Sequence, residues 1–219
     1  MNPVYPAARE KLMTWATQGA RMEELRAAKA EFFQQVGEVR DDEPNFEAWM
    51  DAFGDWYLCD RPLRGGPPPA QQFLNENGAL LDPEEHAVFE AFTRTRRSLF
   101  SLEAVEEGSL RVRDLQTRER HDVVERRKPA GVEAGDIFDA RLIPLPGGMQ
   151  FTGGMIFHPS EVRRMVKVLA SRARKEGPER FQAVMGELAL RRLRVDRYRK
   201  LTPEVVYADL KPKRMWLPW

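Results

Sequence analysis

The sequence predicts an α+β protein in which helical segments flank a small antiparallel β unit. Apolar residues recur at helical spacing before residue 98 and after residue 157, whereas between these positions they alternate with polar residues and short turns. The 219 residues, 42% hydrophobic and 32% charged, have the composition of a folded globular chain. We therefore expect a helical region over 1–97, a β module over 98–157, and basic helices with a tail over 158–219.

Three amphipathic helices are expected in the first 60 residues. Residues 6–17 and 20–36 form the first two. The third begins at Pro44, directly after the acidic run 41–43, which favours a helix N-terminus. The apolar positions of the third helix are Phe46, Trp49, Met50, Phe53, Trp56 and Tyr57. Their helical spacing places them on one face, which we interpret as core rather than as a docking surface.

A loop and a further helix precede the β module. Three consecutive prolines and two glycines within residues 60–69 interrupt regular structure. Asp82 then supplies an N-cap carboxylate, followed by Pro83 at the first helical position and Glu85 at the third. We predict a helix from here to about Arg97.

The β module should contain five short strands, near residues 99–105, 109–114, 119–126, 136–144 and 149–157. Alternation assigns an inward face to Leu110, Val112, Phe138, Leu142, Phe151 and Phe157. Because closure removes exposed edges, five antiparallel strands favour a barrel-like module of the SH3-like or OB-like kind. The pair Gly153 and Gly154 fits a sharp bend in such a module.

Charge is divided unevenly along the chain. Residues 1–160 carry 19 basic and 27 acidic residues, and residues 161–219 carry 16 basic and 7 acidic residues, within a net charge of +1. Two helices are predicted in the basic part, one from His158 to Gly177 and one from Pro178. The candidate partner-binding residues are Arg191, Arg192, Arg194, Arg197, Arg199, Lys213, Arg214, Trp216 and Trp219. We expect this basic segment to contact the acidic part of the chain, within one molecule or in a dimer.

No catalytic, metal-binding or cofactor-binding motif is recognised, so we assign no catalytic residue, metal or cofactor. The histidines His86, His121 and His158 lack the spacing of metal ligands. The single Cys59 cannot form an intramolecular disulfide, and its aromatic helix favours a small buried hydrophobe over a nucleophile.

One pair of carboxylates has a spacing that chemistry could use. Asp51 and Asp55 lie one helical turn apart, as acid–base catalysis or a divalent ion would require. A solvated helix face is the interpretation that we favour.

The same sequence predicts a soluble, cytoplasmic location. The cysteine usage fits a reducing compartment. The first residues lack a basic start and an apolar run, and no segment approaches the roughly 18 apolar residues of a membrane span.

Between residues 53 and 157 the sequence carries an ordered set of short motifs. They are Phe53-x-x-Trp56, Asp60-Arg61-Pro62-Leu63, Phe73-Leu74, Ser98-Leu99-Phe100, Leu110-x-x-Arg113-Asp114-Leu115-x-Thr117, Gly135-Asp136-x-x-x-Ala140-Arg141-Leu142-x-Pro144 and Phe151-x-Gly153-Gly154. This order resembles a set of uncharacterised bacterial proteins that couple a helical N-terminal part to a compact β module. Some of those proteins end in a cysteine-rich SEC-C metal motif, which is absent here, so the resemblance implies the fold but neither zinc nor an activity.

Three functions are therefore considered. The leading hypothesis is a non-enzymatic interaction module that binds a protein partner or a second copy of itself. The alternative is a nucleic-acid-binding protein that uses the basic C-terminal helix, because arginines neutralise phosphates. A hydrolase of unrecognised type is third. An unbroken basic patch would favour nucleic acid. A cleft that gathers Asp51, Asp55 or a histidine around a metal or an ordered substrate analogue would favour an enzyme.

Overall fold

The computed structural model describes residues 2–125, 131–198 and 200–208. Its N-terminal helices are α1 (Tyr5–Ala16), α2 (Arg21–Val36), α3 (Phe46–Cys59), α4 (Pro69–Asn77) and α5 (Pro83–Thr93), with a 3₁₀ turn at Gly78–Leu80. The strands are β1 (Arg96–Glu106), β2 (Ser109–Asp114), β3 (Arg120–Val124), β4 (Ile137–Leu145), β5 (Gly148–Phe151) and β6 (Ile156–Phe157). After a 3₁₀ turn at Ser160–Val162 come α6 (Arg163–Glu176), α7 (Pro178–Arg197) and α8 (Pro203–Ala208). The α+β prediction is confirmed.

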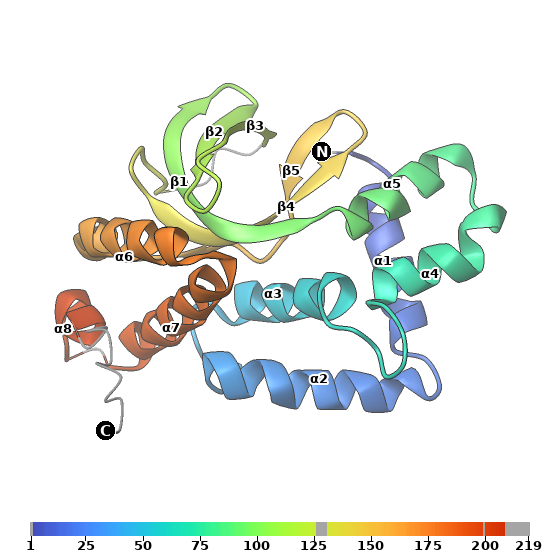
Figure 1. The fold of residues 1–219 in the computed structure, drawn as a ribbon, viewed down its shortest axis with the longest axis horizontal. Helices are drawn as coiled ribbons and strands as arrows, with labels where there is room; N and C mark the ends of the chain where they lie inside the picture. Colours follow the sequence, from blue (N-terminus) through green and yellow to red (C-terminus); the bar gives the residue numbers. More distant parts are fainter. Residues whose placement is uncertain (1, 126–130, 199, 209–219) are drawn as a thin grey trace.

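Most of the helices lie on one side of the curved sheet (Figure 1). Figure 1 shows the curved sheet on one side, and α3 between the sheet and α2 on the other. On α3, Trp49 and Tyr57 are fully buried and Phe53 is nearly so, which confirms their assignment to the core, while Trp56 is partly exposed. The helix begins two residues after the predicted Pro44 because residues 41–45 form turns.

The expected strands are present, but the sheet differs from the predicted barrel. The strand order is β1-β2-β3-β5-β4-β6, and β1 also pairs with β4. All pairs are antiparallel except β3 and β5, which are parallel and joined through Val123 and Met149 alone. The six strands of the described residues therefore form a mixed sheet that is not a clear barrel, rather than a wholly antiparallel five-stranded one.

The predicted fifth strand is divided in two because the chain leaves the sheet between β5 and β6. A Cβ atom on Gly154 would lie 2.6 Å from the backbone nitrogen of Ala52 on α3, so only glycine fits here. The Gly153–Gly154 bend is therefore shaped by the approach of a helix. The predicted helix to Arg97 is likewise too long, since α5 ends at Thr93 and Arg97 already pairs with Arg141 of β4.

Three hydrophobic clusters hold the layers together. Five of the six residues predicted to face inward are buried in the sheet cluster, and Phe157 packs against them partly exposed. A second cluster joins α1–α5 to β4 and to Leu193 of α7. The third joins α6, α7 and α8 to Leu99 of β1 and Ile137 of β4.

The basic C-terminal part contacts the acidic part of the chain within one molecule. Arg197 forms an ion pair with the Glu43 carboxylate at 2.5 Å and donates to the carbonyl of Glu38. Nearby, the Asn45 amide donates to Asp196 at 2.9 Å. No helix of the described residues is long and apolar enough to cross a membrane.

Candidate functional site

Helix α6 carries a basic stripe beside its apolar one. Val166, Ala170 and Ala173 are buried against the rest of the protein. Arg164, Lys167, Ser171 and Arg174 follow at positions i, i+3, i+7 and i+10, which is the spacing of a second helical face. Arg164 and Lys167 are exposed, while Ser171 and Arg174 are partly buried at the sheet.

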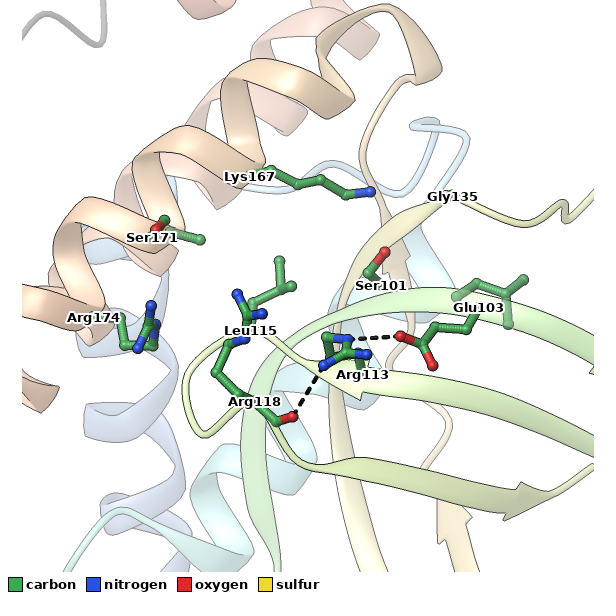
Figure 2. A pocket seen from close by; sticks show the side chains of 11 residues that line it. Ser101, Glu103, Arg113, Leu115, Arg118, Gly135, Lys167, Ser171 and Arg174 are labelled. Atoms are coloured by element: carbon green, nitrogen blue, oxygen red, sulfur yellow. Dashed lines mark hydrogen bonds and ion pairs between the residues drawn. The ribbon is translucent and has the colours of Figure 1, made fainter.

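A cavity of about 300 Å³ lies where this stripe faces strands β1 and β2; we call it the basic cavity. Figure 2 shows Lys167, Ser171 and Arg174 on the α6 wall, with Arg118 and Arg113 on the opposite side. Ser101 of β1, almost completely buried, adds a hydroxyl to the wall.

Most charged side chains that line the basic cavity are positive. Glu103 is the single carboxylate among its described lining residues, and it is held by Arg113 at 2.6 Å and Arg120 at 2.8 Å. Desolvation alone would raise the pKa of Glu103. The two guanidinium groups outweigh it and hold that pKa below its usual value. Arg118, Lys167 and Arg174 form no ion pair within the described part of the chain.

Arg174 is the most enclosed of these three cations. Its Nε is buried and meets no acceptor among the residues that the structure describes. A buried guanidinium N–H without an acceptor costs free energy unless a ligand or water occupies the site. The basic cavity therefore presents donors and positive charge, which suits a phosphate or another oxyanion.

The turn from β2 to β3 positions one side of this cavity. The buried Asp114 carboxylate accepts hydrogen bonds from the Gln116 and Thr117 amides, at 2.7 and 3.1 Å, and from the Ser98 hydroxyl at 2.8 Å. It also pairs with Arg96 at 2.8 Å. Such an Asx turn fixes the backbone locally, and it brings Arg118 to a positive φ of 74°.

A second cavity, of about 440 Å³, lies on the other side of the same turn; we call it the aromatic–amide cavity. Its lining includes the rings of Phe32 and Trp56 and the amides of Gln35, Gln116 and Gln182. Sequence reasoning did not find this site, because its residues come from α2, α3, the β2–β3 turn and α7.

Ion pairs stiffen the wall of the aromatic–amide cavity. Arg97 meets Asp139 in a two-pronged contact of 2.9 and 2.5 Å. The buried Arg141 pairs with Asp60 and donates to the Thr95 hydroxyl at 2.8 Å. Asp60 and Arg141 both belong to the motifs that carried the family resemblance, so those motifs build the junction between helices and sheet.

The pair Asp51 and Asp55 lies at a third cavity, of about 600 Å³, between α1 and the end of β5. Asp51 lines it, but Asp55 is buried, so the interpretation as a solvated helix face is wrong for Asp55. Arg9 bridges the two carboxylates at 3.0 and 3.2 Å. Burial raises the pKa of Asp55, and Arg9 opposes that shift. The three side chains therefore form an ion-pair link between α1 and α3.

Cys59 and a metal site are the remaining candidates for catalytic chemistry. Burial raises the pKa of the Cys59 thiol to about 12, which disfavours a thiolate nucleophile. Among the described residues, no three His, Cys, Asp or Glu side chains gather in a way that could hold a metal ion.

Two of the predicted partner-binding arginines, Arg192 and Arg197, form ion pairs within the described chain. Arg192 donates to the Phe157 carbonyl at 2.7 Å and pairs with Asp196 at 2.6 Å, and Arg197 holds Glu43. Arg191 and Arg194 are partly buried on α7. Arg199, Lys213, Arg214, Trp216 and Trp219 lie outside the described residues. A role of this set in partner binding stays a prediction.

Fold and cavities define an α+β protein with a cationic cavity between its sheet and a basic helix. The chain belongs to the family of unknown function DUF7986, whose model matches residues 22–183. This membership confirms the expected relation to an uncharacterised family. No curated protein and no solved structure matches the chain.

Proposed function

We propose that this protein is a non-enzymatic binding module for nucleic acid, held by its phosphates at the basic cavity and along the exposed face of α6. The observation that carries the proposal is the set of three cations without an ion-pair partner in the described residues, Arg118, Lys167 and Arg174, around one cavity. Phosphate oxygens are the acceptors that such guanidinium and ammonium groups bind best.

The surface next to the cavity extends the same charge. Arg164, Arg172 and Lys175 are exposed on α6, and Glu176 is the one acidic residue of that helix. Exposed cations on a helix neutralise phosphates of a strand, which is the main source of affinity in nucleic-acid binding.

Nucleic acid replaces a protein partner as the favoured ligand for a reason of geometry. A carboxylate of an acidic protein surface could also enter this cavity, but it offers only two acceptor oxygens to the donors of Ser101, Ser171 and Arg174. A phosphate has several acceptor oxygens for those donors. The cytoplasmic location, the bacterial source of the family and self-association remain predictions.

The test is fluorescence anisotropy with a labelled 20-nucleotide strand over a range of salt concentrations. The neutral double variant Lys167→Gln with Arg174→Gln should bind about tenfold more weakly. Its plot of log affinity against log salt should be shallower by about 1.4, as expected for two lost contacts to a single strand.

The matched control is Arg26→Gln with Lys29→Gln, which removes the same charge from the exposed face of α2. This control should bind like the wild type, because neither residue lies near the basic cavity. Equal loss in both variants, or binding of polyglutamate in preference to the strand, would contradict the proposal and return a protein partner to first place.

A further inference from the structure

The aromatic–amide cavity differs in chemistry from the basic cavity. Its charged lining residues are already satisfied within the protein: Arg96 pairs with Asp114, Arg97 with Asp139, and Asp60 with Arg141. A charged ligand group would have to compete with these pairs. The lining that remains free for a ligand is aromatic or neutral and polar.

The neutral polar groups are three amides. Gln35 and Gln182 are exposed, Gln116 is partly exposed, and none of the three side chains forms a hydrogen bond within residues that the structure describes. Each amide offers donors and an acceptor side by side. The edges of nucleobases carry the complementary arrangement, and glutamine reads them in this way.

The aromatic part of the lining completes the match. Trp56 is partly exposed at the cavity, and its ring packs against Phe32 with centroids 5.5 Å apart. The two rings meet at a tilt of 45°, which restrains Trp56, and the flat faces of nucleobases stack on exposed aromatic rings. The cavity volume of about 440 Å³ is within the usual range for small ligands.

The position of the cavity links it to the proposed phosphate site. Gln116 lines the aromatic–amide cavity, whereas Leu115 and Arg118, one and two residues away on the same turn, line the basic cavity. A phosphate and a base of one strand can therefore reach opposite sides of the turn that Asp114 builds.

We propose that the aromatic–amide cavity receives an unstacked nucleobase, so that the nucleic acid bound by this protein is single-stranded. This inference rests on the proposed function. A base in a duplex is stacked on both faces and paired at its edge, so it could not enter the cavity without being extruded.

The experiment compares four labelled ligands of equal length by anisotropy: oligo(dA), oligo(dC), an abasic strand and a duplex. The abasic strand keeps the phosphates and lacks the bases. We expect at least one homopolymer to bind about 5- to 150-fold tighter than the abasic strand, as base–aromatic stacking would give. The duplex should lack this base-dependent gain, so that any excess affinity over the abasic strand comes from its denser phosphates and disappears at high salt.

Gln35→Ala and Gln34→Ala provide a matched pair of neighbours on α2, both exposed, of which Gln35 alone lines the cavity. Gln35→Ala should reduce the difference in affinity between the homopolymer and the abasic strand. Gln34→Ala should leave that difference unchanged. Trp56→Phe should keep the fold and remove most of the tryptophan quenching that the homopolymer causes.

The possible failures are distinguishable. If the abasic strand binds as tightly as every homopolymer, the base site is refuted and the phosphate site stands. If no strand binds, the proposed function fails and this inference fails with it. If a free nucleoside monophosphate displaces the strand at equal concentration, the cavity belongs to a soluble nucleotide and the assignment to a strand is overturned.

Discussion

Arg118 combines an unfavourable backbone conformation with a side chain that lines the basic cavity. Its φ of 74° lies in the left-handed region, where a residue with a Cβ atom costs about 1–2 kcal/mol. Glycine or asparagine would form the same turn more easily. Nothing else in the turn requires arginine here, so we interpret the cation as retained for the cavity.

Exchanging Arg118 for glycine should therefore separate stability from binding. The variant should gain up to about 1 kcal/mol in free energy of unfolding, because the strain is relieved. Its affinity for single-stranded nucleic acid should fall. Urea unfolding and anisotropy measure the two effects. Arg118→Lys, which keeps both the charge and the strain, should match the wild type in stability and retain most of the affinity; a destabilised glycine variant would show that the backbone is not strained.

Helix α3 packs closely against the chain that leaves the sheet between β5 and β6. The chain between β5 and β6 approaches it so closely that Gly154 lies against the backbone of Ala52. By contrast, a Cβ atom added at Gly186 in α7 would meet no atom within 4 Å. These two glycines have opposite environments, although the sequence alone does not distinguish them.

Alanine at these two positions should have effects of opposite sign. Gly154→Ala should lower the free energy of unfolding by about 1–3 kcal/mol, because the helix and the sheet must move apart. Gly186→Ala should raise it by about 0.5–1 kcal/mol, since alanine favours a helix interior. Chemical denaturation of both variants checks the pair, and a neutral Gly154→Ala would mean that α3 is loosely packed.

The periodic spacing of apolar residues predicted most of the helices and strands and their buried faces. The alternation of Leu110 and Val112 and the aromatic stripe of α3 showed which faces are buried, because burial depends on the local pattern. The partner of a strand does not depend on that pattern, so the parallel contact of Val123 with Met149 could not be foreseen. The end of the last strand could not be foreseen either, because it depends on contact with α3.

The candidate site was accessible to sequence reasoning only in part. The spacing of Arg164, Lys167 and Arg174 is visible in the sequence, but the denser arginine cluster after residue 190 drew the interpretation to α7, whose role in partner binding stays a prediction. The side of the turn to which Arg118 and Gln116 point depends on Asp114 and on tertiary contacts. A single sequence does not reveal the tertiary contacts that decide this orientation.

At the scale of the whole molecule, the C-terminal helix α8 is fastened by a buried polar pair. Tyr207 is fully buried, and its hydroxyl lies 2.8 Å from Nδ1 of His158. Burial, with a smaller contribution from the charge of Arg192, lowers the pKa of His158 to about 3. The folded protein therefore holds this imidazole neutral.

Stability should fall as the pH is lowered through the range in which only the unfolded chain binds this proton. An unfolded histidine takes up a proton near pH 6.5, whereas folded His158 does so only near pH 3. The loss should approach about 1.4 kcal/mol per pH unit between these values. Urea unfolding of His158→Gln should show a weaker pH dependence than the wild type, with His86→Gln as the control; equal slopes in all three would exclude His158 as the source.

The packing of α7 against the N-terminal helices has a consequence for synthesis of the chain. The second hydrophobic cluster contains Leu12 and Tyr57 of the N-terminal helices, and Ala189 and Leu193 of α7, which the ribosome adds much later. A ribosome that adds about 5–20 residues per second needs on the order of ten seconds to bridge that interval. During this interval the N-terminal helices α1–α5 leave part of their apolar surface exposed. A nascent-chain chaperone would find a binding site there.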